Sequence, residues 1–345
     1  IEWGLRGNFL EPGEVVTPGV PTAFGSLPDG VPLDRRAVTA WLFAPENPLT
    51  YRVAANRVWS QFFGRGIVET EEDFGSQGSL PTHPELLDWL AVSYRDDLRG
   101  SLKGLCRLIV TSATYRRSAV GDSESMRRDP ANRWLARAPR PRLSGEAVRD
   151  ASLVAAGLLS DRIGGPSVMP MQPDGIWQTT YSSLEWQTSP GEDRHRRSIY
   201  TFLRRTSPYP SLVTFDAGSR EVCLIRRIST NTPLQALVTL NDPVFVEAAG
   251  ALGRRMRAAG SEFDVRITEG FRRVVGRHPS DDEIGSLARL VDEIERDFKD
   301  HPEAAAEMAA AGGAADGAGV DRVAEATWTV VGNVLLNLAE AVVRP

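Results

Sequence analysis

Apolar residues recur every three to four positions along most of this chain, which is the spacing of helices that bury one face. The first such segment follows Asp34 and carries Ala37, Trp41 and Leu42, and a second starts near Leu49. Further helical segments begin near residues 82, 101, 144, 232, 242, 265, 280 and 321. The pattern therefore predicts a mainly α fold, a multi-helix orthogonal bundle.

The period changes between Ile163 and Val213, where Gly, Pro and aromatic residues interrupt the helical spacing. Within this region the segment RRSIYTFLRR, residues 196–205, alternates apolar and polar side chains in the manner of a strand. We therefore expect a small β insertion, a sheet or long hairpin, around residues 163–213.

The distribution of Gly, Pro and Ala suggests how the chain is divided. Residues 1–33 are rich in Gly and Pro and are predicted to be an extended arm or the remnant of a linker. Residues 34–345 are predicted to form a single mostly helical domain, with an irregular or β insertion over residues 160–230 and a low-complexity loop at residues 304–319. The chain starts at Ile1 rather than Met, which suggests a processed form or a piece of a longer protein.

Arginines are concentrated in residues 194–241, which contain eight arginines and two acids and end in the helix start TNTPLQAL. There Thr232 is suited to the N-cap, Pro233 to the first helical position and Gln235 to a capping box. A helix N-terminus beside arginines is a plausible anion site. The candidate anion-binding residues are Arg204, Arg205, Arg220, Arg226, Arg227, Asn231, Thr232 and Gln235. The alternative is that these arginines form ion pairs that hold an irregular segment to neighbouring helices.

Aromatic residues near this stretch suggest sugar stacking. The candidates are Trp177, Trp186, Tyr200 and Tyr209. An equally simple interpretation places them in the hydrophobic core of an irregular region.

Composition excludes several classes of protein. The net charge of -5 argues against a nucleic-acid binder, and no apolar run reaches the ~18–20 residues of a membrane span. The four histidines are far apart and no Cys pair has zinc or haem spacing, so we expect no metal or cofactor held by this chain alone. Whether Cys106 and Cys223 form a disulfide is left open.

Acid–base chemistry has only scattered candidates. Asp73, His83, Asp216 and Glu221 are the residues that could serve a hydrolase or lyase, since such enzymes need carboxylates on either side of the bond. Their spacing selects no pair. Asp216 and Glu221 could equally be salt-bridge partners of nearby arginines.

Several long strings together resemble the planctomycete surface domain family. They include RVAANRVWSQFFGRGIVETEEDFGSQGSLPTHPELLDWLA, DPANRWLARAPRPRLSGEAVRDASL and FDAGSREVCLIRRISTNTPLQALVTLNDPVFVEAA. Members are domains of unknown function in large exported proteins, usually C-terminal to a partner module and often to a c-type cytochrome domain. The resemblance assigns no reaction and no catalytic residue.

The resemblance implies an exported protein, periplasmic or at the cell surface, in a setting of polysaccharide degradation. Its implied partners are a partner module or c-type cytochrome domain of the same system, with haem only through that partner, and a sulfated or anionic polysaccharide. Three functions remain open: a non-catalytic binding or assembly domain for glycans, a carbohydrate-active enzyme, and a redox partner domain of a cytochrome. We favour the first, with no catalytic activity of its own.

Overall fold

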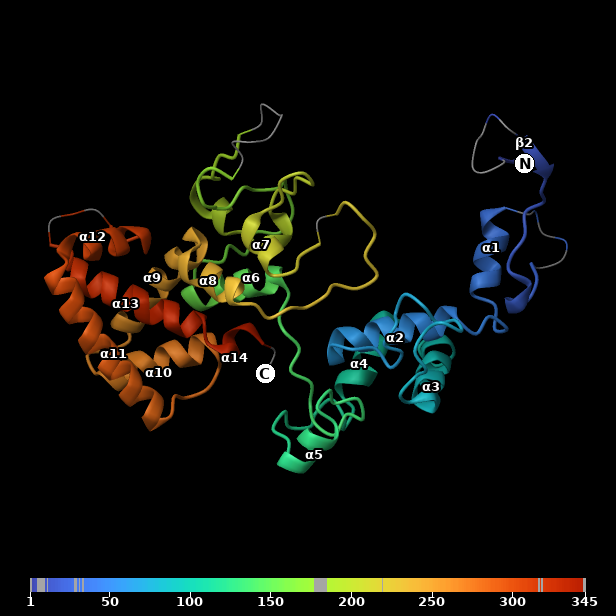
Figure 1. Ribbon diagram of the computed structural model, residues 1–345, viewed down its shortest axis with the longest axis horizontal. Helices are drawn as coiled ribbons and strands as arrows, with labels where there is room; N and C mark the ends of the chain where they lie inside the picture. Colours follow the sequence, from blue (N-terminus) through green and yellow to red (C-terminus); the bar gives the residue numbers. More distant parts are fainter. Residues whose placement is uncertain are drawn as a thin grey trace. The chain divides into compact units, whose positions relative to one another are not determined.

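The computed structural model describes residues 2–4, 10, 12–27, 30, 32, 34–176, 185–218, 220–315, 317 and 319–343. These residues form helices α1 to α14 and two short strands, so the mainly α fold class is confirmed (Figure 1). Backbone contacts divide the chain into two compact units, Ile1–Pro139 and Arg140–Pro345. The sequence pattern suggested a single domain over residues 34–345, whereas each unit buries hydrophobic side chains of its own.

The first unit starts with two antiparallel strands, β1 (Glu2–Gly4) and β2 (Pro12–Val15), in the segment expected to be an extended arm. Its helices are α1 (Arg35–Leu42), α2 (Thr50–Phe63), α3 (Pro84–Arg95), α4 (Leu102–Val110) and α5 (Ser123–Arg128). Apolar side chains of α2, α3 and α4 meet in one core, which includes Trp59, Leu90 and Leu105. The side chain of Asn56 is buried in this unit and bonds both backbone groups of Val68, which fixes the loop after α2.

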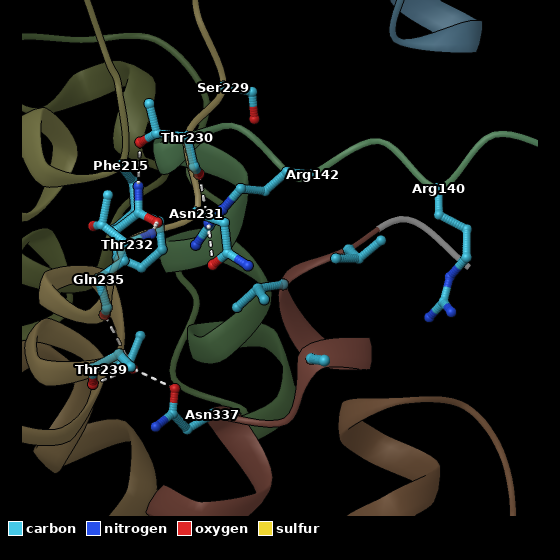
Figure 2. A pocket seen from close by; sticks show the side chains of 14 residues that line it. Arg140, Arg142, Phe215, Ser229, Thr230, Asn231, Thr232, Gln235, Thr239 and Asn337 are labelled. Carbon is cyan, nitrogen blue, oxygen red and sulfur yellow. Dashed lines mark hydrogen bonds between the residues drawn. The ribbon is translucent and has the colours of Figure 1, made fainter. Parts of the chain in front are cut away.

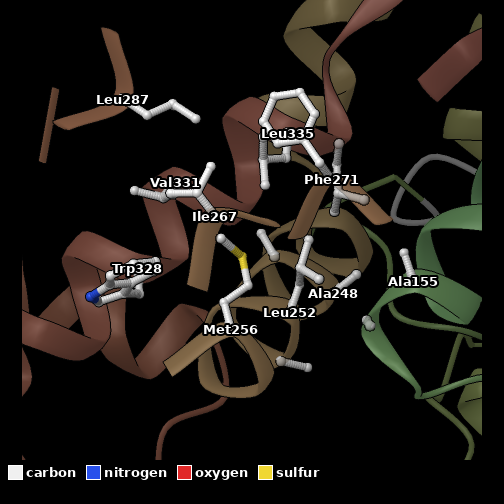
Figure 3. Close-up of a cluster of buried hydrophobic side chains, with 14 of the residues drawn as sticks. Ala155, Ala248, Leu252, Met256, Ile267, Phe271, Leu287, Trp328, Val331 and Leu335 are labelled. Atoms are coloured by element: carbon white, nitrogen blue, oxygen red, sulfur yellow. The ribbon is translucent and has the colours of Figure 1, made fainter. Parts of the chain in front are cut away.

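The second unit contains the longer helices. They are α6 (Gly145–Ala156), α7 (Pro210–Thr214), α8 (Pro233–Asn241), α9 (Pro243–Ala258), α10 (Phe263–Val274), α11 (Asp281–Asp300), α12 (Pro302–Ala311), α13 (Arg322–Leu336) and α14 (Ala339–Val342). Helix α9 is central and packs against α6, α10 and α13. The core between them includes Ala155, Ala248, Leu252, Met256, Ile267, Phe271, Leu287, Trp328, Val331 and Leu335 (Figure 3). None of the helices in the described ranges is both long and apolar enough to cross a membrane.

Helices α9 and α13 approach closely because glycines face the partner helix. A Cβ added at Gly332 of α13 would lie 2.4 Å from the carbonyl oxygen of Ala249 in α9. A Cβ added at Gly253 of α9 would lie equally close, 2.4 Å, to the carbonyl oxygen of Trp328. The distance between the two helices is therefore set by direct contact between their backbones.

We expect Gly332→Ala to destabilise the fold by about 1–3 kcal/mol, because the added methyl group must push the two backbones apart. Gly285→Ala is the matched control: its helix α11 leaves the added Cβ no neighbour nearer than Arg289 Nη1 at 3.9 Å. That control should be neutral or stabilising by up to about 1 kcal/mol, since Ala favours helix. Urea unfolding of both variants measures the difference, and equal shifts in the same direction would contradict the packing argument.

The prediction of a small sheet around residues 163–213 is wrong for the described part of that region. In the described part of that region, residues 163–176 and 185–213, the backbone forms no strand; it forms two isolated parallel bridges, Ser160–Arg196 and Val168–Thr201. A short 3-10 turn at Ser198–Tyr200 lies where the strand was expected, and another at Gly191–His195 precedes it. The described part of the insertion is irregular rather than β.

Buried arginines explain why this irregular segment holds together. Arg149 of α6 donates to the carbonyl oxygens of Arg194 and Arg196, each at 2.9 Å. Arg196 in turn donates to the carbonyl oxygen of Pro166 at 2.9 Å, and its guanidinium lies 3.8 Å from the ring centre of Tyr200. Guanidinium groups therefore satisfy carbonyl groups that strand partners would satisfy in a sheet.

Candidate functional site

One pocket in the second unit has the features of a binding site. Its volume is about 410 Å³, and it lies between the segment entering α6, the start of α8 and the chain around α14 (Figure 2). The lining residues are Arg140, Arg142, Phe215, Ser229, Thr230, Asn231, Thr232, Gln235, Ala236, Thr239, Asn337, Ala339, Val342 and Val343. The pocket is thus assembled from four stretches of the chain, at residues 140–142, 215, 229–239 and 337–343.

Two arginines enter the pocket from one extended stretch. Pro141 disfavours helix in the preceding residue, and Arg140 and Arg142 on either side of it both line the pocket. An antiparallel bridge to Val343 holds Arg142 in place. Within the described residues the exposed guanidinium of Arg140 forms no ion pair. Arg140 therefore offers the pocket a charge that no acid among the described residues pairs with.

Arg142 is the anchored member of the pair. Its Nη1 donates to the carbonyl oxygen of Thr230 at 2.7 Å and to Asn231 Oδ1 at 3.2 Å, and its guanidinium lies 5.1 Å from the ring centre of Phe215. Burial lowers the pKa of Arg142, and the carboxylate of Asp216 opposes that shift. Arginine keeps its charge in proteins, so the side chain is a partly desolvated cation.

A buried hydrogen-bond network supports the start of α8. Gln235 is almost fully buried; its Oε1 accepts from the backbone N–H of Thr232 at 3.0 Å and its Nε2 donates to the carbonyl oxygen of Thr214 at 2.9 Å. Asp216 accepts from the backbone N–H of Thr230 at 2.8 Å and from its hydroxyl at 2.9 Å. The network fixes residues 230–232 at the pocket wall.

The Asn231 carboxamide adds a donor beside the two arginines. Because arginine can only donate, its contact to Asn231 directs the carboxamide oxygen toward Arg142, and the amide nitrogen faces the pocket (Figure 2). The Thr230 carbonyl, the Asn231 amide oxygen and Gln235 Oε1 already accept bonds from protein donors. A ligand rich in acceptors, above all an anion, matches this inventory.

The structure brings together only part of the predicted anion site. Asn231, Thr232 and Gln235 line the pocket, but none of the five candidate arginines does. Arg227 forms a two-pronged ion pair with Glu146 at 2.7 and 2.9 Å. Arg204 donates to the hydroxyl of Thr206 at 3.2 Å, and Arg205, Arg220 and Arg226 are exposed. The pocket takes its cations from Arg140 and Arg142 instead.

The candidate acid–base residues make separate local contacts. Asp73 accepts from the backbone N–H of Gly75 at 2.7 Å, and His83 Nδ1 lies 2.9 Å from the hydroxyl of Thr82. Asp216 is held by Thr230, and Glu221 is exposed. Asp73 and His83 belong to the first unit and Asp216 and Glu221 to the second.

The candidate stacking aromatics contact one another or the protein. Tyr209 is buried, donates to the carbonyl oxygen of Met171 and stacks on Trp186 with ring centres 5.7 Å apart. The ring of Tyr200 is covered by Arg196. Trp177 lies outside the described residues. Tyr209 and Tyr200 thus serve the interior of the insertion.

The described ranges show the state of both cysteines and the placement of potential metal ligands. Cys106 and Cys223 are both free thiols. No group of three or more His, Cys, Asp or Glu side chains there is arranged to hold a metal ion.

The sequence pattern did not single out the two pocket arginines, Arg140 and Arg142, because they precede the arginine-rich stretch by about fifty residues. Their signal was the string RPR, in which a proline separates two arginines of one extended segment. Only a pairing with the distant C-terminal segment makes that string part of a site.

Residues 34–291 match the family described as PSD1, protein of unknown function (DUF1553). No curated protein matches the chain. No solved structure matches it either.

Proposed function

The chain belongs to the PSD1 family of unknown function, and we propose that it is a non-catalytic domain that binds an anionic polysaccharide. The sulfate or carboxylate group of a sugar unit enters the pocket beside Arg140, Arg142 and Asn231. The observation that carries the proposal is that two arginines, Arg140 and Arg142, line one pocket beside the amide of Asn231. Asn231, Thr232 and Gln235, which were expected to bind an anion, form part of the wall of the proposed site.

The physical basis is the cost of leaving a desolvated cation without a partner. A hydrogen bond to a charged group contributes about 1.5–3 kcal/mol, more than one between neutral groups. Arg142 is already partly removed from water, so an anion in the pocket gains more from it than from an arginine on the open surface. The apolar side chains of Phe215, Val342 and Val343 complete a wall for the sugar ring.

The proposal also covers location and neighbours. The resemblance to exported planctomycete proteins supports a place in the periplasm or at the cell surface. It also supports a partner module or c-type cytochrome domain in the same system, with haem supplied only by that partner. A carbohydrate-active enzyme receives less support, because the oxygens of Asp216 are taken up by Thr230.

We expect Arg140→Ala to weaken binding of a sulfated oligosaccharide about tenfold, since it removes one charge-assisted contact without removing a structural one. Arg140 is preferred over Arg142 for this test because Arg142 also holds Thr230 and Asn231. Isothermal titration of dextran sulfate fragments into wild type and variant gives the two dissociation constants.

Arg272→Ala is the matched control for Arg140→Ala, because Arg272 is an exposed arginine of α10 outside the pocket lining. It removes the same charge and should leave affinity nearly unchanged. A joint Arg204→Ala and Arg205→Ala variant tests the site expected from the sequence. If that variant loses binding while Arg140→Ala keeps it, the pocket is not the site.

A further inference from the structure

A second feature suited to sugars lies in the first unit, where Trp134 is 65% exposed. The next residue, Leu135, is turned inward and packs against the core formed by α2, α3 and α4. The loop thus sets an apolar anchor beside a large aromatic ring that faces solvent. An exposed indole face of this kind can stack on the ring of a ligand.

The loop that carries Trp134 is held by a buried carboxylate. Asp129 is 6% exposed, and its two oxygens accept from the backbone N–H groups of Arg133 and Trp134, each at 2.8 Å. Burial alone would raise the pKa of Asp129, but these two N–H groups and the charge of Arg137 hold that pKa below its usual value. Asp129 therefore fixes the backbone of Trp134 as an ionised acceptor.

The same loop stores backbone strain. Asn132 and Leu135 have φ values of 50° and 57°, in the left-handed region, which Asn tolerates but Leu rarely occupies. The side chain of Asn132 bonds the backbone of Arg137 in both directions, at 2.8 and 3.3 Å. Strain of this kind persists where surrounding contacts impose it, and it is concentrated at binding sites.

Arginines bond the backbone of the loop that carries Trp134. Arg117 donates to the carbonyl oxygens of Leu135 and Ala136, each at 3.1 Å, and Arg137 donates to those of Asp129 and Pro130. Arg133 precedes the tryptophan and is exposed. Residues 116–139 contain six arginines and three acids, a local charge of +3 in a chain of net charge -5.

We infer that Trp134 is a stacking platform for a sugar ring of an acidic polysaccharide, with Arg117, Arg133 and Arg137 attracting its anionic groups. This site lies within the first unit and is separate from the pocket of the second. It shares the ligand class of the proposed function but depends on none of the pocket residues. The flat apolar face of a pyranose ring matches an exposed indole, and the arginines select acidic chains over neutral ones.

The test compares Trp134→Ala with Trp89→Ala in the full chain. Trp89 is the matched control, because it is 53% exposed on α3 of the same unit. Dextran sulfate fragments are titrated into each protein while tryptophan emission is followed. We expect Trp134→Ala to weaken binding roughly three- to tenfold and to lose the emission change, as stacking of aromatic groups contributes about 0.5–1.5 kcal/mol. Trp89→Ala should keep both, and Trp134→Phe should restore most of the affinity.

Other outcomes decide against the inference. Equal affinities for Trp134→Ala and wild type would overturn it, as would equal losses in both tryptophan variants. Binding of neutral dextran as tight as that of dextran sulfate would exclude the role of the arginines. Measuring Arg140→Ala in the same assay separates the two sites. Loss of dextran sulfate affinity in Trp134→Ala alone supports the Trp134 platform and refutes the pocket. Loss of affinity in Arg140→Ala alone supports the pocket and refutes the platform.

Discussion

Replacing Arg149 with alanine should destabilise the second unit by about 3–5 kcal/mol, the largest effect we expect from a single change. Arg149 is 1% exposed, and it donates to two carbonyl oxygens and to the hydroxyl of Ser198. Alanine would leave those acceptors buried without donors and would leave a cavity the size of a guanidinium group. Most of the loss should fall on the irregular segment that Arg149 holds.

Two measurements test this expectation. Urea unfolding gives the change in the free energy of unfolding, and the exposed control Arg272→Ala should change it by less than about 0.5 kcal/mol. Hydrogen exchange should show faster exchange at the amides of Ser198 and Phe202, which now bond Asp150 and Val168. A cost below about 1 kcal/mol would mean that other contacts hold the segment.

Asp242→Asn should stabilise the protein above pH 6 and leave it unchanged near pH 4. Burial raises the pKa of Asp242 from its ordinary value of 3.8 to about 6, against the opposing effects of the Val244 N–H group and Arg149. The folded state therefore binds a proton more tightly than the unfolded state does. The stability associated with that proton is complete below about pH 4 and is lost as the pH rises through 6.

The size of this effect follows from the shift. A pKa difference of about two units corresponds to roughly 3 kcal/mol between the two ends of the range. Asn keeps the N-cap hydrogen bond that Asp242 accepts from Val244 at 3.1 Å, so α9 should still start correctly. Tyr209 and Arg149 face the same carboxyl and are unchanged in the variant.

The measurement is the free energy of unfolding of wild type and Asp242→Asn at intervals from pH 4 to pH 8. The difference between them should grow with pH and level off above about pH 7. A difference that stays constant over this range would show that Asp242 titrates normally despite its burial.

Local chemistry made the helix starts predictable. Asp34, Asp242 and Ser280 each accept a hydrogen bond from the first turn of the helix that follows, as their positions indicated. Thr232 and Gln235 form the expected capping box, and Gly64 ends α2 in the left-handed conformation. These features depend on residues within one turn of each other, so the sequence contains all the information needed.

For the alternating segment at residues 196–205, the same kind of local reasoning predicted a strand that does not form. A period of two predicts an extended backbone, but it does not supply a strand partner. Here Arg149 and Arg196, both buried, bond the carbonyl groups that a neighbouring strand would otherwise bond. Periodicity cannot reveal a side chain that arrives from a helix about fifty residues away.

The sequence by itself determined the mainly α class, the principal helix caps and the contribution of Asn231, Thr232 and Gln235 to a polar helix start. The tertiary structure alone decided which cations accompany them. Arg142 bonds Thr230, 88 positions further along the chain, and pairs with Val343 near the C-terminus. Such contacts form because packing of α6, α8 and α14 closes long loops, and the free energy of that closure depends on the whole core rather than on any local stretch.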